Sequence, residues 1–419
     1  MKLIEPPDWF QKAEFCGSYY SMEIPTEEQK RQLSLFPFII WAYPFTLEES
    51  VREFQKKGIK VLVYISLYKA VSLKEASEVK ETSEVRSSLK IYRGGPFYSE
   101  CMKNPFWRAT NLDNHPEWKL INEKGEFQKP FRNPNYLKGW YQVCRDVPGY
   151  KEAVLKGVKD LLDWGADGVF VDNVGCGNRE VCYGEKKGFH KHLRNLQSWE
   201  LELNILKEVY KLVKKYDKEK VVFTNGIHFD LLDCTDGGII ENYICSSLGN
   251  FSNNVGYLLQ LGGIGESYMK HKKRAIGLPY IGTKGRTKID DLFYSYSFAK
   301  LSQMGIWVHY DKDKHKILED RRAEILFTLD LGEPLHRKER PDKIIGVQYK
   351  NGILYRVFKK GMVVVNPLSK KIRITIEIPK GVKCVENIFT GKKMKISKNK
   401  LSLTLSPISG RVYKFSYRG

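Results

Sequence analysis

Several familiar features are missing from this chain of 419 residues. No stretch approaches the run of about 18 apolar residues that predicts a membrane-spanning helix. The first residues, MKLIEPPDWF, lack the apolar core of a secretory signal peptide. We therefore expect a cytoplasmic protein with no membrane partner.

The eight cysteines include no CxxC pair. The only cluster of metal-ligand types is Cys176, Cys182, His190 and His192, and its spacings differ from the usual zinc-ligand patterns. We therefore expect reduced thiols, with no metal and no cofactor. A disulfide between Cys176 and Cys182 remains possible, although it is disfavoured in a cytosolic protein.

Acidic residues are fewer than basic ones, 49 against 70, and the net charge is +21. Such a charge can indicate nucleic-acid binding. Here most lysines occur singly or in pairs such as Lys359-Lys360 and Lys392-Lys393, with no accompanying aromatic-basic motif. A solvated basic surface is the better interpretation, so we expect no nucleic-acid partner. Richness in lysine and glutamate is also typical of thermophiles.

What is present is an ample core, since 42% of the residues are hydrophobic, arranged as alternating strands and helices. Capping-box pairs, Thr26 with Gln29 and Thr46 with Glu49, predict two of the helix starts. This alternation predicts a (β/α)8 TIM barrel over residues 1–335. The expected strands are 16–20, 38–43, 60–68, 169–171, 220–226, 238–243, 274–282 and 305–311.

Two segments depart from the alternation. Residues 71–148 form a long insertion after the third strand, where barrels carry catalytic-face loops. A structured loop there is usually functional, so we expect it to fold over the barrel mouth and supply aromatic contacts. Residues 340–419 alternate apolar and polar side chains, which predicts a C-terminal antiparallel β-sandwich.

The stretch GADGVFVDN (Gly165–Asn173) suggests where the chemistry lies. Its apolar strand is typical of a parallel sheet buried on both faces, and it ends at Asp172. The carboxyl ends of the strands are where barrel enzymes keep their active sites. A capping role for Asp172 in the next turn is the alternative. Asp167, at the start of the strand, is interpreted as structural.

A second carboxylate, Glu241, ends the sixth strand. Glycoside hydrolysis needs one carboxylate as nucleophile or base and a second carboxylic acid to protonate the leaving oxygen. We therefore predict a retaining glycosidase with Asp172 as nucleophile and Glu241 as acid/base. Glu266, expected in the loop after the sixth strand, is the reserve acid. The other candidate substrate-binding residues are strand-end polar groups and aromatic residues: Asn173, Asn225, Tyr243, Trp41, Trp107, Trp307, His309 and Asp311.

The stretch CRDVPGYKEAVLKGVKDLLDWGADGVFVDN resembles the fourth-strand region of barrel glycoside hydrolases. The similarity is to uncharacterised hydrolase-like families and, more distantly, to α-fucosidase and α-galactosidase groups. HPEWKLINEKGEFQKPF (His115–Phe131) resembles the segment that precedes this strand in such families. The resemblance implies a nucleophilic carboxylate at the end of the fourth strand, a position that Asp172 matches.

Two alternative hypotheses assign a different function to the same site. A transglycosidase would transfer the glycosyl group to another sugar, and a degenerate barrel would bind carbohydrate without turnover. Each reading implies an oligosaccharide or glycoside as partner. The sequence leaves open the sugar, the anomer and the oligomeric state.

Overall fold

Eight strands of the computed structural model close into a barrel, in the order β1-β10-β9-β8-β7-β6-β3-β2. The structure describes residues 4–78, 95–134, 137–176, 180–194, 196, 198–308, 320–335 and 347–417. The barrel strands are β1 (Phe15–Tyr19), β2 (Phe38–Trp41), β3 (Lys60–Ser66), β6 (Gly168–Asp172), β7 (Val221–Asn225), β8 (Gly237–Glu241), β9 (Arg274–Leu278) and β10 (Gly305–Val308). Each overlaps one of the expected strands, so the barrel prediction is confirmed.

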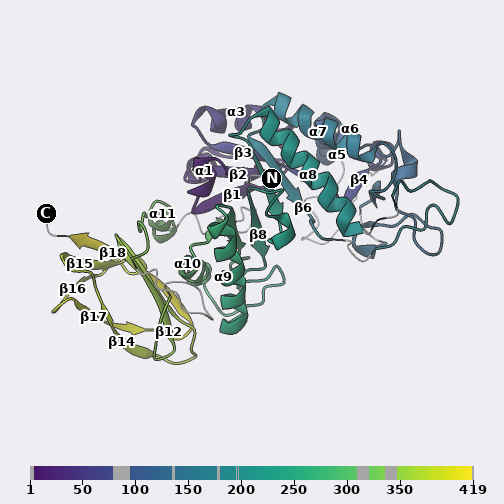
Figure 1. The fold of residues 1–419 in the computed structure, drawn as a ribbon. Coiled ribbons are helices and arrows are strands. Elements are labelled where there is room, and N and C mark those ends of the chain that lie inside the picture. Colours follow the sequence, from purple (N-terminus) through teal and green to yellow (C-terminus); the bar gives the residue numbers. More distant parts are fainter. Residues whose placement is uncertain are drawn as a thin grey trace. The chain divides into compact units, whose positions relative to one another are not determined.

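The helices alternate with these strands, and short 3-10 turns (η) occur in the loops. The α-helices are α1 (Asp8–Gln11), α2 (Glu27–Leu33), α3 (Glu48–Lys56), α4 (Leu73–Ser77), α5 (Gly95–Lys103), α6 (Pro105–Ala109), α7 (Tyr150–Trp164), α8 (Ser198–Tyr216), α9 (Val255–Lys270), α10 (Lys288–Leu301) and α11 (Arg321–Phe327). The 3-10 turns are η2 (Pro116–Trp118), η3 (Pro130–Arg132) and η4 (Phe229–Leu231). Helices α7 and α8, which cover strands β3, β6 and β7, run side by side (Figure 1).

The chain divides into two compact units, and the division falls within the barrel sequence. The first unit comprises Met1–Gln11, Ser18–Lys30 and Pro37–Gly238, and the second comprises Lys12–Gly17, Arg31–Phe36 and Ile239–Gly419. The expected domain boundaries, 1–335 and 340–419, therefore stay a prediction.

One of the two predicted capping boxes forms. The Thr26 amide donates to Gln29 Oε1 at 2.8 Å, and the Gln29 amide donates to Thr26 Oγ1 at 3.2 Å. The Thr46–Glu49 box is wrong, because the N-cap of α3 is Leu47 with no side-chain cap. The Thr46 amide and hydroxyl donate instead to Glu100 of α5. A buried carboxylate from a distant segment has thus replaced the local partner.

Two other boundaries differ from the sequence expectation. The sequence pattern also predicts a long helix from about His190 to Lys215, but helix α8 begins at Ser198, and residues 180–194 before it form a loop. The glycine-rich stretch after β8, expected as a loop, is helix α9, which includes Glu266. Gly265 serves close packing there, since a Cβ would lie 2.5 Å from Met304 Sδ.

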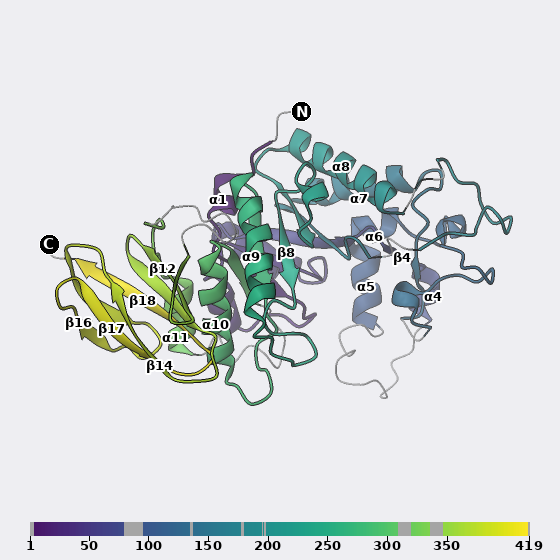
Figure 2. The same cartoon turned by 60° about the horizontal axis from the view of Figure 1, so that its bottom comes forward.

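The insertion after β3 has its own hydrophobic packing. A small antiparallel sheet pairs β4 (Lys69–Val71) with β5 (Trp140–Gln142). Helices α4, α5 and α6 gather near β4 (Figure 2). Trp107, Trp118 and Trp140 are all buried, with at most 4% of each residue exposed. These rings belong to the hydrophobic core of the first unit. The expectation that the insertion folds over the barrel mouth and supplies aromatic contacts stays a prediction.

The C-terminal segment forms two antiparallel sheets that share one core. The first has the order β11-β12-β13-β18-β15-β16 and the second pairs β14 with β17. Alternating residues such as Ile374, Ile376, Leu401 and Leu403 are buried against the larger sheet. The predicted antiparallel β-rich fold is confirmed. Its strands are β11 (Gln348–Lys350), β12 (Ile353–Phe358), β13 (Gly361–Asn366), β14 (Ile372–Glu377), β15 (Val382–Asn387), β16 (Lys393–Lys395), β17 (Lys400–Leu405) and β18 (Ser409–Tyr417).

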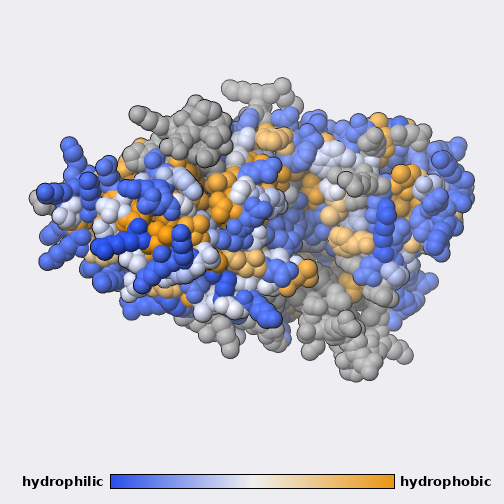
Figure 3. Space-filling view, turned by 90° about the horizontal axis from the view of Figure 1, so that it is seen from below, coloured by the Kyte–Doolittle hydropathy of each residue, from blue (hydrophilic) through white to orange (hydrophobic). Residues whose placement is uncertain are grey.

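No described helix is long and apolar enough to cross a membrane. On the face shown in Figure 3, hydrophilic residues cover much of the surface, with hydrophobic residues scattered between them.

Candidate active site

Asp172 lies at the carboxyl end of β6, where three neighbouring strands present polar side chains. Tyr64 on β3 pairs in register with Phe170, and Phe170 pairs with Phe223 on β7. Because side chains alternate along a strand, Asp172 and Asn225 follow those phenylalanines on the same face. The barrel thus changes from aromatic packing to polar groups within two residues.

Both oxygens of the Asp172 carboxylate accept hydrogen bonds. The Tyr64 hydroxyl donates to Oδ2 at 2.5 Å, and Asn225 Nδ2 donates to Oδ1 at 2.6 Å. The side chain is only half-buried. A carboxylate offers about four acceptor positions, so two donors fix its orientation and still leave lone pairs for a reacting atom. This geometry suits a nucleophile or a base.

The residue after Asp172 turns the chain out of the strand. Asn173 has φ of 61°, in the left-handed region that asparagine tolerates better than most residues. The Ser66 hydroxyl donates to Asn173 Oδ1 at 3.3 Å. Asn173 and Asn225 therefore both lie beside Asp172, as the sequence predicts.

A buried ion pair braces the loop that follows. Arg145 and Glu202, both nearly fully buried, approach to 3.4 Å. Arg145 donates to the Cys176 carbonyl at 3.3 Å, and Glu202 accepts from the Gly175 amide at 3.4 Å. Burial raises the pKa of Glu202, an effect that Arg145 opposes. The pair fixes the backbone just beyond Asp172.

Four aromatic candidates are core residues in this structure. Trp41, Trp107, Tyr243 and Trp307 each have at most 4% of their surface exposed. Gly277 lies under the Tyr243 ring, since a Cβ there would be 2.5 Å from Cδ1. None of the four presents an exposed ring face on which a sugar could stack.

The remaining candidates belong to the second unit or lie outside the described residues. Glu241 ends β8, is exposed, and accepts a hydrogen bond from the Tyr280 hydroxyl at 2.8 Å. Glu266 is buried within α9. His309 and Asp311 lie outside the described residues.

Sequence reasoning missed Tyr64, Arg145 and Glu180. Tyr64 carries the only side-chain hydroxyl in the otherwise apolar run VLVYI (residues 61–65). A polar group near the end of a barrel strand is the signal that could have identified it. Arg145 and Glu180 offered no local signal, because their partners are distant in sequence. Glu180 lies in the loop after β6 and accepts from Gln142 Nε2 at 3.2 Å.

The closed parallel barrel, together with a family match, places the chain in the barrel glycoside hydrolase superfamily. Residues 85–362 match the family described as "Hypothetical glycosyl hydrolase family 15", and the chain belongs to this family. A comparison with curated proteins found no match.

Several solved structures share the fold. The Nostoc punctiforme debranching enzyme is 12% identical, with 99% of this chain and 100% of that chain covered and a TM-score of 0.54. The Anoxybacillus α-amylase is 11% identical, with 99% of each chain covered and a TM-score of 0.53. The Arthrobacter globiformis isomalto-dextranase, in complex with panose, is 9% identical, with 99% of this chain and 75% of that chain covered and a TM-score of 0.55. At such identities the similarity shows the fold alone.

Proposed function

We propose that this protein is a retaining glycoside hydrolase in which Asp172 is the nucleophile. The observation that carries the proposal is the Asp172 carboxylate, held by Tyr64 and Asn225 at the ends of three adjacent barrel strands. In a retaining enzyme such a carboxylate attacks the anomeric carbon, forming a glycosyl-enzyme ester that water then hydrolyses. Family membership supports the reaction class.

We assign the acid/base role to Glu241, which also ends a barrel strand. It would protonate the leaving oxygen and then deprotonate the attacking water. Glu180 and Glu266 are the other carboxylates to compare with it. Glu241→Gln should slow substrates with poor leaving groups far more than activated aryl glycosides, which need little protonation. If Glu180→Gln or Glu266→Gln shows that pattern instead, the acid role belongs to that residue.

The nucleophile is tested by matched substitutions at the two ends of β6. On a substrate found from a panel of aryl glycosides, Asp172→Asn should lower kcat by at least about 10³-fold. Asp167→Asn is the control. Asp167 holds the opposite strand end through Val61 and Gln55, so it should affect stability and leave kcat near normal.

Product stereochemistry distinguishes the mechanisms. Proton NMR during hydrolysis should show first the anomer of the substrate, and inversion would refute the nucleophile assignment. Transfer to an added sugar acceptor would indicate a transglycosidase. Carbohydrate binding with no turnover of any substrate in the panel would favour the non-catalytic alternative.

A further inference from the structure

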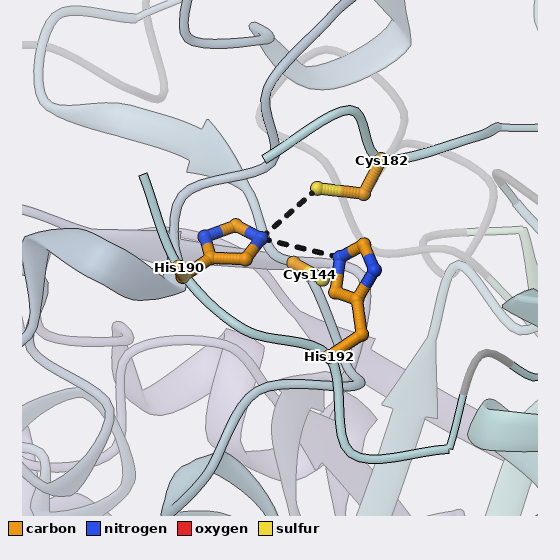
Figure 4. A group of neighbouring side chains, drawn as sticks. All are labelled: Cys144, Cys182, His190 and His192. Carbon is orange, nitrogen blue, oxygen red and sulfur yellow. Dashed lines mark hydrogen bonds between the residues drawn. The ribbon is translucent and has the colours of Figure 1, made fainter. Parts of the chain in front are cut away.

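A second group of reactive side chains lies in the first unit, outside the Asp172 site. Cys144, Cys182, His190 and His192 each offer one donor atom, and these four atoms all lie within 4.8 Å of one another. Figure 4 shows His190 Nε2 between Cys182 Sγ and His192 Nε2. From this geometry we infer a tetrahedral zinc site formed by these four residues.

The spacing of the donor atoms supports a metal. Zinc ligands at about 2.0–2.1 Å for nitrogen and about 2.3 Å for sulfur give donor–donor separations of about 3.3–3.8 Å in a tetrahedron. The Cys182 Sγ–His190 Nε2 distance is 3.3 Å, and the His190 Nε2–His192 Nε2 distance is also 3.3 Å. A ring nitrogen carries either one proton or one lone pair, so His190 Nε2 cannot pair well with both neighbours. A cation between them satisfies all three atoms.

The donor set selects the ion. Two thiolates and two imidazoles in a tetrahedron are typical of structural zinc, whereas oxygen ligands would favour magnesium or calcium. Binding displaces the protons of the two thiols, which leave as the Zn–S bonds form. Four protein ligands leave no open coordination position, so this site is structural.

Groups around the four ligands also fit a metal site. Glu185 Oε2 lies 3.6 Å from His192 Nδ1, and the other ring nitrogen, Nε2, faces His190 Nε2. Carboxylates take this position behind zinc-bound histidines. Gly184 leaves room for the His190 ring, since a Cβ at that position would lie 2.1 Å from Nε2. A cavity of about 440 Å³, lined in part by Cys144, Cys182 and His192, gives the ion a path from solvent.

The site joins two segments that are distant in sequence. Cys144 follows β5 at the end of the insertion, and the other three ligands lie in the loop between β6 and α8. The backbone supports this junction, because the Tyr183 amide donates to the Ile121 carbonyl at 2.9 Å. The loop begins directly after Asp172, so zinc would hold one side of the proposed active site.

This inference reverses the expectation of no metal from the sequence. In the sequence, Cys176 is the cysteine nearest to Cys182. In the folded chain, Cys144 and not Cys176 belongs to the ligand group with Cys182. Cys176 is therefore the matched control, a cysteine of the same loop that is outside the ligand group.

Metal analysis of the full-length protein, purified without chelator, tests the site. We expect about one zinc per chain in the wild type and in Cys176→Ser, with at least a tenfold loss in Cys144→Ser and Cys182→Ser. Cobalt substitution of the wild type should give the intense visible bands of tetrahedral Co²⁺ with thiolate ligands. An octahedral cobalt spectrum, or equal zinc loss in Cys176→Ser, would contradict the assignment.

If the cysteine variants fail to fold, a measurement on the wild-type protein still tests the site. Chelation should lower the Tm by roughly 5 °C or more, and Zn²⁺ but not Mg²⁺ should restore it. A wild-type protein with neither bound zinc nor any zinc-dependent change in Tm would overturn the inference. A Cys144–Cys182 disulfide in the protein purified from the cytoplasm would overturn it as well. These readouts do not depend on glycosidase activity, so they stand or fall apart from the proposed function.

Discussion

The hydroxyl of Tyr64 is the clearest single contact to the proposed nucleophile, and its removal is a direct test. Tyr64→Phe deletes one charge-assisted hydrogen bond to Asp172. Such a bond contributes about 1.5–3 kcal/mol, so we expect kcat to fall by about 10–100-fold with little change in Tm. Tyr216→Phe, on the exposed side of α8, is the control. An unchanged kcat in Tyr64→Phe would show that this contact plays no part in turnover.

Glu100 gives stability a dependence on pH that is separate from catalysis. The residue is buried on α5, and its carboxylate accepts from the amides of Phe45 at 3.2 Å and Thr46 at 2.6 Å. Burial raises its pKa from 4.5 to about 7, against the lowering effect of the bonds from Thr46. Between these values the folded state keeps a proton that the unfolded state has released. Stability from this group is therefore fully present below about pH 4 and is lost as pH rises through about 7.

Urea unfolding of Glu100→Gln at pH 5 and pH 8 measures that effect. The loss from pH 4 to pH 8 amounts to about 2–4 kcal/mol, because one pKa unit corresponds to about 1.4 kcal/mol. Glutamine cannot ionise, so the variant should lose less stability than the wild type between pH 5 and pH 8. Equal losses in the two proteins would place the ionisation of Glu100 outside this range.

At the scale of the helices, two glycines should respond to alanine in opposite directions. In α7 a Cβ on Gly157 would lie 2.9 Å from the Cα of Phe106 in α6, where two backbones approach closely. In α9 a Cβ on Gly263 would meet nothing within 4 Å. Gly157→Ala should cost about 1–3 kcal/mol through overpacking. Gly263→Ala should stabilise by about 0.5–1 kcal/mol through helix propensity. Denaturant titration of the pair checks both signs, and destabilisation by both would contradict this account of α9.

The sequence predicts these elements where local periodicity decides the structure. Buried parallel strands are short apolar runs, and β6 from Gly168 to Asp172 has that pattern without ambiguity. The N-terminus of α3 has a distant partner in Glu100, and Gly265 of α9 packs closely against the distant Met304. A local pattern carries no information about those contacts, which is why the loop expected around Glu266 proved to be a helix.

Some residues of the candidate sites can be identified from local sequence patterns, and others cannot. Asp172 is identifiable because strand ends are functional positions in barrels, and Asn173 and Asn225 follow from the same rule. The zinc ligands are not identifiable, because Cys144 reaches the other three only through the folding of the insertion. Aromatic residues were the weakest predictions, since composition cannot separate a ring in the core from a ring at a binding surface.

At the scale of the whole molecule, the C-terminal sheets pack against a helix of the barrel within the second unit. Helix α10 is buried nearly all round, with twelve of its fourteen residues buried. It contacts β9 and β10 of the barrel and also β12, β13 and β18 of the larger C-terminal sheet. Gly410 on β18 allows that approach, since a Cβ would lie 2.5 Å from the Phe293 carbonyl oxygen. Arg356 donates to the Leu301 carbonyl at the end of the helix.

A chain that ends at residue 346 should therefore fail to fold stably, because its α10 would expose the apolar face that the sheet covers. Each fully buried large side chain contributes about 1.5–3 kcal/mol, and exposure of Phe293 and its neighbours would exceed the net stability of about 5–15 kcal/mol typical of a domain. We expect increased binding of a hydrophobic dye and loss of cooperative thermal unfolding in the shortened chain. In the full-length protein, Gly410→Ala should lower the Tm without abolishing cooperativity. Cooperative unfolding of the shortened chain at the wild-type Tm would instead show that residues 340–419 form an independent domain, as the sequence alone predicts.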